Sequence, residues 1–199
     1  MMFQLTPIVK FLLILNVGMY ILSMMFGLDH ILAIHSIKSP YFIPSQFLTY
    51  MFSHDRGSLM HLFFNMLIFA QFGPQLESYL GSKRFGNFVM VCGVSVGVSW
   101  MLINTFFLHN IGASMHGFSG VLFGVYALLA LYFPYQRIQL MFIPFDFKLR
   151  NLAFAIIGYN VFMLINGSGG NISYLAHVLG VVFALLLHKV WQYLDSRDI

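Results

Sequence analysis

Four polar residues in otherwise apolar stretches of the chain could do chemistry together. His61 and Asn65 are four residues apart, so on a helix they project from one face, one turn apart. Ser119 lies in the sequence GFSG, and His177 lies in the sequence AHVLG. A serine hydroxyl is a weak nucleophile unless a neighbouring base takes its proton, and a neutral imidazole suits that role. These residue types therefore predict acyl transfer, with Ser119 as the nucleophile and His177 as the base.

Acyl transfer also needs hydrogen-bond donors for the oxyanion of the tetrahedral intermediate. The Asn65 amide, the His61 ring and the backbone N–H of Ser119 at the start of a helix could supply them. No aspartate or glutamate lies at the same depth in any apolar stretch, so we expect a dyad without a carboxylate to orient the base. Phe123, one turn after Ser119, is expected to stack on His177 and hold its ring.

Each of these residues taken alone also has an ordinary structural interpretation. Asn65 alone is more often a polar contact between helices, His61 an interfacial or core histidine, and Ser119 a serine bonded to a carbonyl one turn back. The functional interpretation depends on their joint occurrence at one depth on three helices. Glu77 is expected to accept hydrogen bonds from loop donors. Three further asparagines are expected to bond to neighbouring helices or to face the membrane interface: Asn16, Asn104 and Asn160.

The composition requires these residues to lie in a membrane protein. Only 8% of the 199 residues are charged and 59% are hydrophobic, whereas soluble domains carry about 25% charged residues. The formal charge of +4 is small and scattered, which disfavours a nucleic-acid surface. The single cysteine, Cys92, offers neither an internal disulfide nor a metal-binding pair.

Six apolar runs of about the length that crosses a bilayer can be placed in the chain. We therefore predict an all-α fold, a polytopic bundle of six transmembrane helices in a single domain over residues 1–199. A long loop at about 29–58 is too apolar for free water and is expected to lie partly in the membrane interface. The runs lie near residues 8–28, 59–80, 85–107, 117–134, 149–166 and 172–193.

Charges and small residues predict the orientation and the packing of the bundle. Eight of the ten lysines and arginines fall at the termini and in alternate loops, which places both termini in the cytoplasm. The glycine-rich segment 166–171 is expected to act as a lid or hinge. Two small-xxx-small pairs, which let helix backbones approach closely, predict that the fourth and sixth runs touch beside Ser119 and His177: Gly120 with Gly124, and Gly180 with Ala184.

The chain resembles the rhomboid family of intramembrane serine proteases from about residue 44 to the end of the sixth run. The motifs that carry the resemblance are HLFFNM with His61 and Asn65, FGPQLESYLGSKRF, the box from Gly117 to Gly120, and AHVLG with His177. The resemblance implies a Ser119 nucleophile, a His177 base, and an oxyanion site that includes His61 and Asn65. It also implies cleavage of a transmembrane protein substrate near the outer face of the membrane, with no metal and no cofactor. The compactness of the chain predicts a bacterial inner (cytoplasmic) membrane.

The chain departs from the family pattern at three positions. Phe118 replaces the usual alanine of the box, which is expected to crowd the substrate channel or alter side-chain preference. Phe123 stands where tyrosine is common, and Ala184 stands where a second glycine is common. Ser114 lies in a similar GASM sequence just upstream, but it lacks the following glycine, so Ser119 is assigned as the nucleophile.

Other classes of protein fit the sequence less well. The main alternative is a non-catalytic rhomboid-like binder of membrane proteins, although such relatives typically lack the serine or the histidine. A small transporter is disfavoured because the polar residues cluster near one face and no inverted repeat is visible. A metalloprotease is disfavoured because the chain has no H-E-x-x-H motif.

Overall fold

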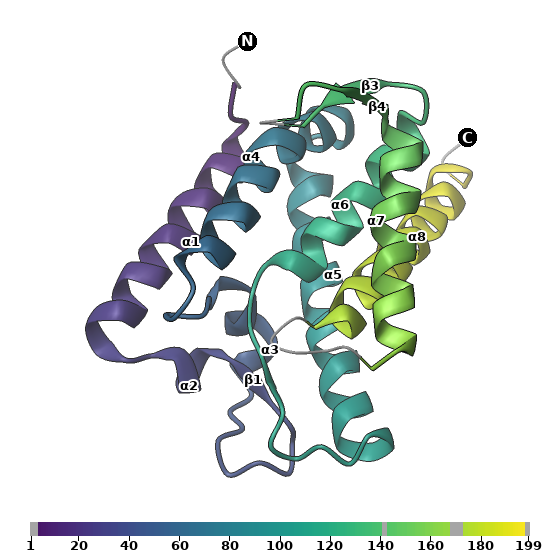
Figure 1. The fold of residues 1–199 in the computed structure, drawn as a ribbon. Helices are drawn as coiled ribbons and strands as arrows, with labels where there is room; N and C mark the ends of the chain where they lie inside the picture. The colour runs from purple at the N-terminus through teal and green to yellow at the C-terminus, as the bar shows by residue number, and fades with distance from the viewer. Residues whose placement is uncertain (1–3, 141–142, 168–172, 198–199) are drawn as a thin grey trace.

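The computed structural model describes residues 4–140, 143–167 and 173–197, and it shows a bundle of long helices joined by short elements (Figure 1). Each long helix overlaps one of the six runs predicted from the sequence. The long helices are α1 (Pro7–Phe26), α4 (Leu59–Leu80), α5 (Ser82–Leu102), α6 (Ser119–Tyr132), α7 (Leu149–Ile165) and α8 (Tyr174–Asp195).

Among the described residues, three helical segments are long and apolar enough to cross a membrane: Pro7–Phe26, Ser82–Phe107 and Tyr174–Asp195. The second of these is α5 together with a π-helical extension, Ile103–Phe107. Helices α6 and α7 are apolar but shorter. The chain is thus mostly helical with several candidate membrane spans, and the count of six spans stays a prediction.

Glu77 on α4 links α1, α4 and α5 by hydrogen bonds at one end of the bundle. Its carboxylate accepts hydrogen bonds from the Thr6 hydroxyl, from the backbone N–H groups of Ile8 and Val9 at 3.1 and 3.0 Å, and from the Ser82 hydroxyl at 2.6 Å. The first N–H groups of a helix lack partners within the helix, so the carboxylate satisfies two such donors of α1. Glu77 was expected to accept bonds from loop donors, and of its donors only Thr6 lies outside a helix, while the others lie in the first turns of α1 and α5.

The segment between α1 and α4 packs into the protein as well as covering one end of it. It contains α2 (Asp29–Leu32), β1 (Ile34–His35), α3 (Gln46–Thr49) and a 3-10 turn, Tyr50–Phe52. The Tyr50 hydroxyl donates to the carbonyl oxygen of Gly93 at 2.7 Å. A Cβ atom added to Gly93 would lie 1.9 Å from Met51 Sδ. The missing side chain on α5 therefore makes room for this segment.

Two short antiparallel ribbons are present in the described residues, and the first joins segments that are far apart in the sequence. β1 pairs with β2 (Ser114–Met115), so that Ile34 lies opposite Met115. β3 (Arg137–Gln139) pairs with β4 (Asp146–Lys148) between α6 and α7. The chain is mostly helical, as predicted, and the prediction did not include these ribbons because strands of two or three residues are too short to show a period in the sequence.

Helix α6 is the central helix, and nine of its 14 residues are buried. It begins inside the bundle, at the end of a long segment that rises along the outside from the far end of α5 (Figure 1). This position explains why a helix of 14 residues can carry a site within the protein. Its first residue is Ser119.

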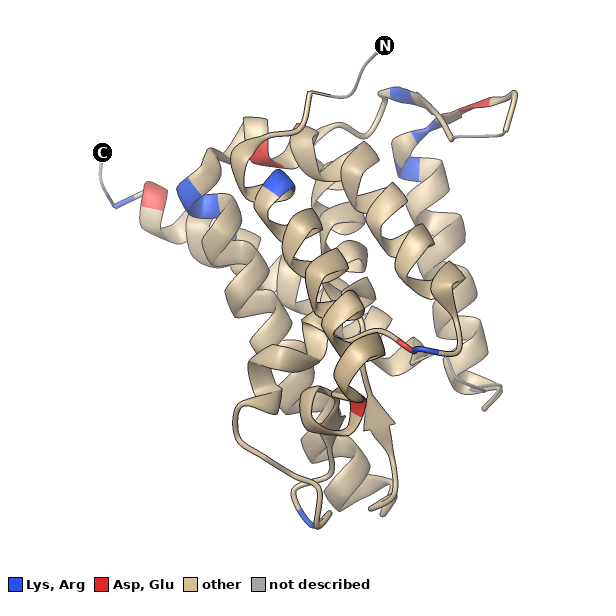
Figure 2. Ribbon diagram, turned by 90° about the vertical axis from the view of Figure 1, so that its left-hand side faces the viewer, with Lys and Arg blue, Asp and Glu red and all other residues tan. Residues whose placement is uncertain are grey.

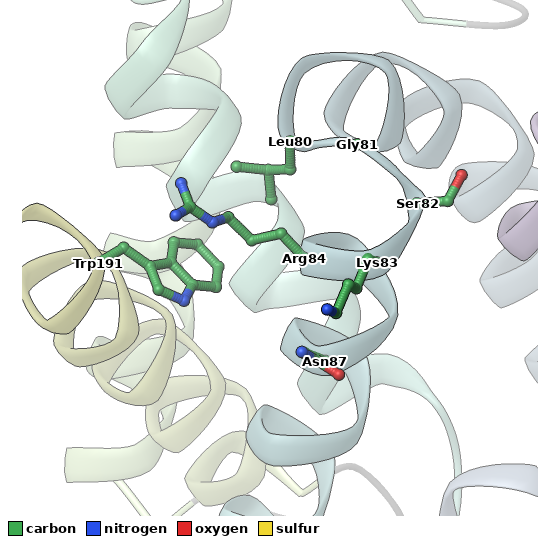
Figure 3. Close-up of a pocket in the computed structure, with 7 residues that line it drawn as sticks. All are labelled: Leu80, Gly81, Ser82, Lys83, Arg84, Asn87 and Trp191. Atoms are coloured by element: carbon green, nitrogen blue, oxygen red, sulfur yellow. The ribbon is translucent and has the colours of Figure 1, made fainter. Parts of the chain in front are cut away.

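Charged residues gather at the end of the bundle that holds both chain termini (Figure 2). A pocket of about 400 Å³ at this end is lined by the turn from Leu80 to Arg84, by Asn87 and by Trp191 (Figure 3). Arg84 is already paired there, since it donates to Asp195 at 2.6 and 3.1 Å and lies over the Trp191 ring. Trp191 is 14 residues after His177 on α8, about 21 Å along the helix, so this pocket is remote from Ser119.

Candidate active site

Ser119 and His177 lie within hydrogen-bond distance of each other. The distance from His177 Nε2 to Ser119 Oγ is 2.8 Å. Ser119 is the first residue of α6 and is partly exposed, while His177 is the fourth residue of α8 and is buried. The two helices thus bring together a hydroxyl and an imidazole that are 58 residues apart in the chain.

The glycines of α6 and α8 allow this close approach. A Cβ atom added to Gly180 would lie 1.9 Å from the carbonyl oxygen of Gly120. A Cβ atom added to Gly124 would lie 3.1 Å from the carbonyl oxygen of Gly180 and 3.3 Å from the Ala184 Cβ. The two small-residue pairs found in the sequence therefore face each other at the closest contact of the two helices.

The His177 ring is held on two sides. The Phe123 ring stacks on it, with 4.1 Å between ring centroids and 7° between planes. On its edge, His177 Nδ1 lies 2.7 Å from Asn160 Oδ1. Phe123 was expected in this place from the sequence.

Asn160 was not singled out from the sequence as part of the site. It had been grouped with the other asparagines that bond to helices or face the interface. One signal was present, since Asn160 is a polar residue in an apolar run, five residues before the end of α7, and polar groups in such runs are costly. Its partner depends on the rotation of α7 about its axis, which the sequence does not specify.

His61 and Asn65 border a space beside the residue Gly117. A Cβ atom added to Gly117 would lie 3.0 Å from His61 Cε1 and 3.9 Å from Asn65 Nδ2. Asn65 Nδ2 is buried and has no hydrogen-bond partner among the described residues. Gly117 has a φ of +114°, which L side chains rarely adopt, and its N–H donates to the carbonyl of Tyr50 at 2.9 Å. The unpartnered Asn65 amide thus lies beside Gly117, which precedes Ser119 by two residues.

Two further histidines from the loops, His54 and His116, lie next to His61. The ring centroids of His54 and His61 are 5.3 Å apart, and those of His61 and His116 are 5.9 Å apart. Burial, with a smaller effect of the charges on His61 and His116, lowers the pKa of His54 to about 3. Burial also lowers the pKa of His116. Both loop histidines are therefore neutral at neutral pH. In the described ranges, no group of three metal-ligating side chains is arranged to hold a metal ion.

The Phe118 side chain lies in the core of the protein. This side chain is fully buried, and its ring packs edge-on against Phe69 with 4.8 Å between centroids. Phe118 therefore fills the core, and its effect on a substrate channel or on side-chain preference stays a prediction. Ser114, the serine of the similar upstream sequence, lies on β2 with an exposed side chain. The predicted glycine-rich hinge falls mostly on residues 168–171, which lie outside the described residues.

The fold and the site together define a helical membrane protein with a serine and a histidine paired inside the bundle. Residues 44–192, about three quarters of the chain, match the model of the rhomboid domain family. The chain belongs to the rhomboid family, which confirms the resemblance found in its motifs. The family consists of multi-pass membrane proteins that are generally intramembrane serine proteases. No match was found among curated proteins.

Proposed function

We propose that this protein is an intramembrane serine endopeptidase that cleaves transmembrane protein substrates through Ser119 and His177. The observation that carries the proposal is the distance of 2.8 Å between Ser119 Oγ and His177 Nε2. A nucleophile and a base within hydrogen-bond reach, with the base oriented by other groups, form the arrangement that nucleophilic catalysis requires. Membership of the rhomboid family supports the same class of reaction.

In the first half of the reaction, Ser119 Oγ attacks the carbonyl carbon of the scissile peptide bond while His177 Nε2 takes the hydroxyl proton. The tetrahedral intermediate collapses as the C–N bond breaks, and the imidazolium gives its proton to the leaving amine. In the second half, water attacks the ester carbonyl and His177 takes a proton from the water. The ester C–O bond then breaks, and Ser119 recovers its hydrogen.

The oxyanion of each intermediate is bound by the donors around Gly117. The Asn65 amide is buried and unpartnered among the described residues, so it is available to a new acceptor. The His61 ring borders the same space. The N–H of Ser119 is a third donor, because the first residue of a helix has no acceptor within its own helix. Such fixed donors stabilise charge that develops only as the reaction proceeds.

The substrate class follows from the surroundings of the site. Ser119 lies inside a bundle of apolar helices, so its substrate is expected to be a membrane-embedded segment. A peptide bond within a helix has its backbone groups hydrogen-bonded, and this protects it from attack. We therefore assign a transmembrane protein that unwinds locally near the outer face of the membrane. The concentration of Lys and Arg at the end with both termini (Figure 2) supports a cytoplasmic position for that end in a cytoplasmic membrane. The mechanism uses only side chains, backbone groups and water.

The test is cleavage of a single-span model substrate in proteoliposomes, combined with labelling by a fluorophosphonate that reacts with activated serines. Ser119→Ala and His177→Ala should each abolish cleavage and labelling while the protein stays folded in detergent. Ser114→Ala is the matched control and should keep both. Cleavage by Ser119→Ala would refute the assignment of the nucleophile. A parent protein that binds the substrate but neither cleaves it nor reacts with the probe would instead support a non-catalytic binder.

A further inference from the structure

We infer that Asn160 is the third member of a Ser119–His177–Asn160 triad, as the residue that positions the base. The inference rests on the proposed function of the Ser119–His177 pair. It concerns what holds the imidazole in its reactive state. Asn160 lies on α7, whereas Ser119 and His177 lie on α6 and α8. The triad would thus be built from three helices.

The hydrogen bonds of the Asn160 amide define which of its ends faces the histidine. Its Nδ2 donates to the carbonyl oxygen of Ile156, one turn earlier on α7, at 2.8 Å. The Oδ1 atom therefore faces His177 Nδ1, from which it is separated by 2.7 Å. A carbonyl oxygen only accepts hydrogen bonds, so Nδ1 must carry the hydrogen. The Nε2 atom is then the acceptor, which is the state that a base for the Ser119 hydroxyl requires.

Other asparagines of the chain provide an internal comparison. Asn16 and Asn104 make the same bond from Nδ2 to the carbonyl four residues earlier, at 2.8 and 2.9 Å. This bond is one way to satisfy an amide in an apolar helix. The Oδ1 atom of Asn16 is buried without a partner among the described residues. Asn160 differs because its second end is bonded to the side chain of the base on another helix.

Asn160 and Phe123 constrain the His177 ring in different ways. Phe123 stacks on the face of His177 and fixes the plane of the ring, but stacking is the same for both tautomers. Asn160 accepts from the ring edge and so selects the tautomer. When His177 takes the serine proton, Nδ1 still donates to Asn160, and a hydrogen bond from a charged donor is stronger than one from a neutral donor. Asn160 therefore stabilises the imidazolium as well as the correct neutral form.

No carboxylate competes for this position in the described parts of the chain. The titratable side chains near the His177 ring are His61, which acts on it through its charge, and Tyr174, whose ring centroid lies 6.3 Å away. Neither is hydrogen-bonded to Nδ1, whose partner is Asn160. A neutral amide thus holds the place that an aspartate holds in soluble serine proteases. An amide suits a buried site better, because an unpaired carboxylate is costly to bury.

The experiment compares Asn160→Leu and Asn160→Asp with the parent and with Asn104→Leu. The leucine variant removes the acceptor, and the aspartate variant keeps it and adds a negative charge. Asn104→Leu removes the same bond to the preceding turn without touching the histidine. Each protein is assayed in detergent for the pH profile of kcat/KM on a single-span substrate and for the rate of fluorophosphonate labelling. Nitrogen NMR of labelled histidine reports the tautomer of His177.

Asn160→Leu should lower kcat and the labelling rate by about 10- to 100-fold with little change in KM, since general base catalysis as a whole is worth about 10²–10⁴-fold. Its His177 nitrogen signals should show a mixture of tautomers. Asn160→Asp should remain active, and the acid limb of its pH profile should move to higher pH, because a carboxylate favours the imidazolium. Asn104→Leu should match the parent in all three measurements.

A parent-like rate and pH profile for Asn160→Leu would overturn the inference. If Asn160→Leu does not fold, the nearly isosteric Asn160→Asp decides the question, and an unmoved acid limb would then overturn it. The failure of the proposed function is distinguishable from this result. Cleavage by Ser119→Ala would refute the protease assignment, whereas an inactive Ser119→Ala beside a fully active Asn160→Leu would refute the triad alone.

Discussion

Gly180→Ala tests whether the contact between α6 and α8 sets the geometry of the site. The added Cβ would lie 1.9 Å from the carbonyl oxygen of Gly120 and 2.8 Å from its carbonyl carbon. Both are backbone atoms, so no change of rotamer relieves the overlap. Real Cβ atoms essentially never come closer than 3.0 Å to another heavy atom. The helices must therefore separate by the difference, about 1.1 Å, at this level.

This separation falls directly on the catalytic pair. Ser119 precedes Gly120 on α6, and His177 lies less than one turn before Gly180 on α8. Ser119 Oγ and His177 Nε2 are 2.8 Å apart. Adding the displacement puts these two atoms about 3.9 Å apart, which is too far for a hydrogen bond. A misplacement of about 1 Å can cost about 100-fold in rate. Overpacking of this kind also costs about 1–3 kcal/mol of stability.

The assay is the rate of fluorophosphonate labelling, with thermal unfolding in detergent measured on the same samples. Gly124→Ala should have a smaller effect, because its nearest contacts are the Phe88 ring edge at 3.0 Å and the Gly180 carbonyl at 3.1 Å. Gly158→Ala on α7 meets nothing within 4 Å and should match the parent. If Gly180→Ala reacts with the probe at the parent rate, the link between helix contact and catalytic geometry is wrong.

Three further predictions concern single side chains. Asn65→Ala should slow turnover through loss of an oxyanion donor worth about 3 kcal/mol or less, and an unchanged rate would make Asn65 a packing residue only. Glu77→Gln should lower the unfolding temperature, because the Thr6 and Ser82 hydroxyls lose a charged acceptor worth about 1.5–3 kcal/mol per bond, yet it should leave labelling of Ser119 intact. The folded-state pKa of His54, about 3, lies below its ordinary value, so the unfolded chain binds the proton first and stability, complete above about pH 6.5, should fall as the pH drops towards 3. His54→Leu should flatten this fall in melts recorded across that range, and a parent-like slope in the variant would contradict the prediction.

The sequence identifies those site residues that lie in a recognisable local pattern, such as a pair of small residues or the spacing of one helical turn. Ser119 and His177 each lie beside a pair of small residues, and these pairs predict which helices touch. His61 and Asn65 are one turn apart, so their shared face follows from helix geometry alone. The long helices were found for a similar reason, because each is a long apolar run in a chain with few charges.

Other features depend on the direction of a side chain in three dimensions. Asn160 occupies an apolar run much as Asn104 does, and only the rotation of α7 turns it towards His177. Phe118 follows Gly117 in the box, but its ring is directed into the core against Phe69. The two ribbons were missed because each strand is shorter than the segments in which alternation can be recognised.

The bond between His177 and Asn160 also limits how α7 can move in the proposed protease. Helix α7 has only three buried residues, Leu149, Ala153 and Asn160, and the last of these lies five positions before its end at Ile165. The bond of 2.7 Å is lost once α7 shifts by about 0.8 Å at that level. The final turn beyond Asn160 can move without this loss, whereas a displacement of the helix at the level of Asn160 cannot occur without it. Helix α7 is therefore fixed at Asn160 and free in its final turn, so in the proposed protease we expect a substrate that enters beside that turn to leave the His177–Asn160 bond intact.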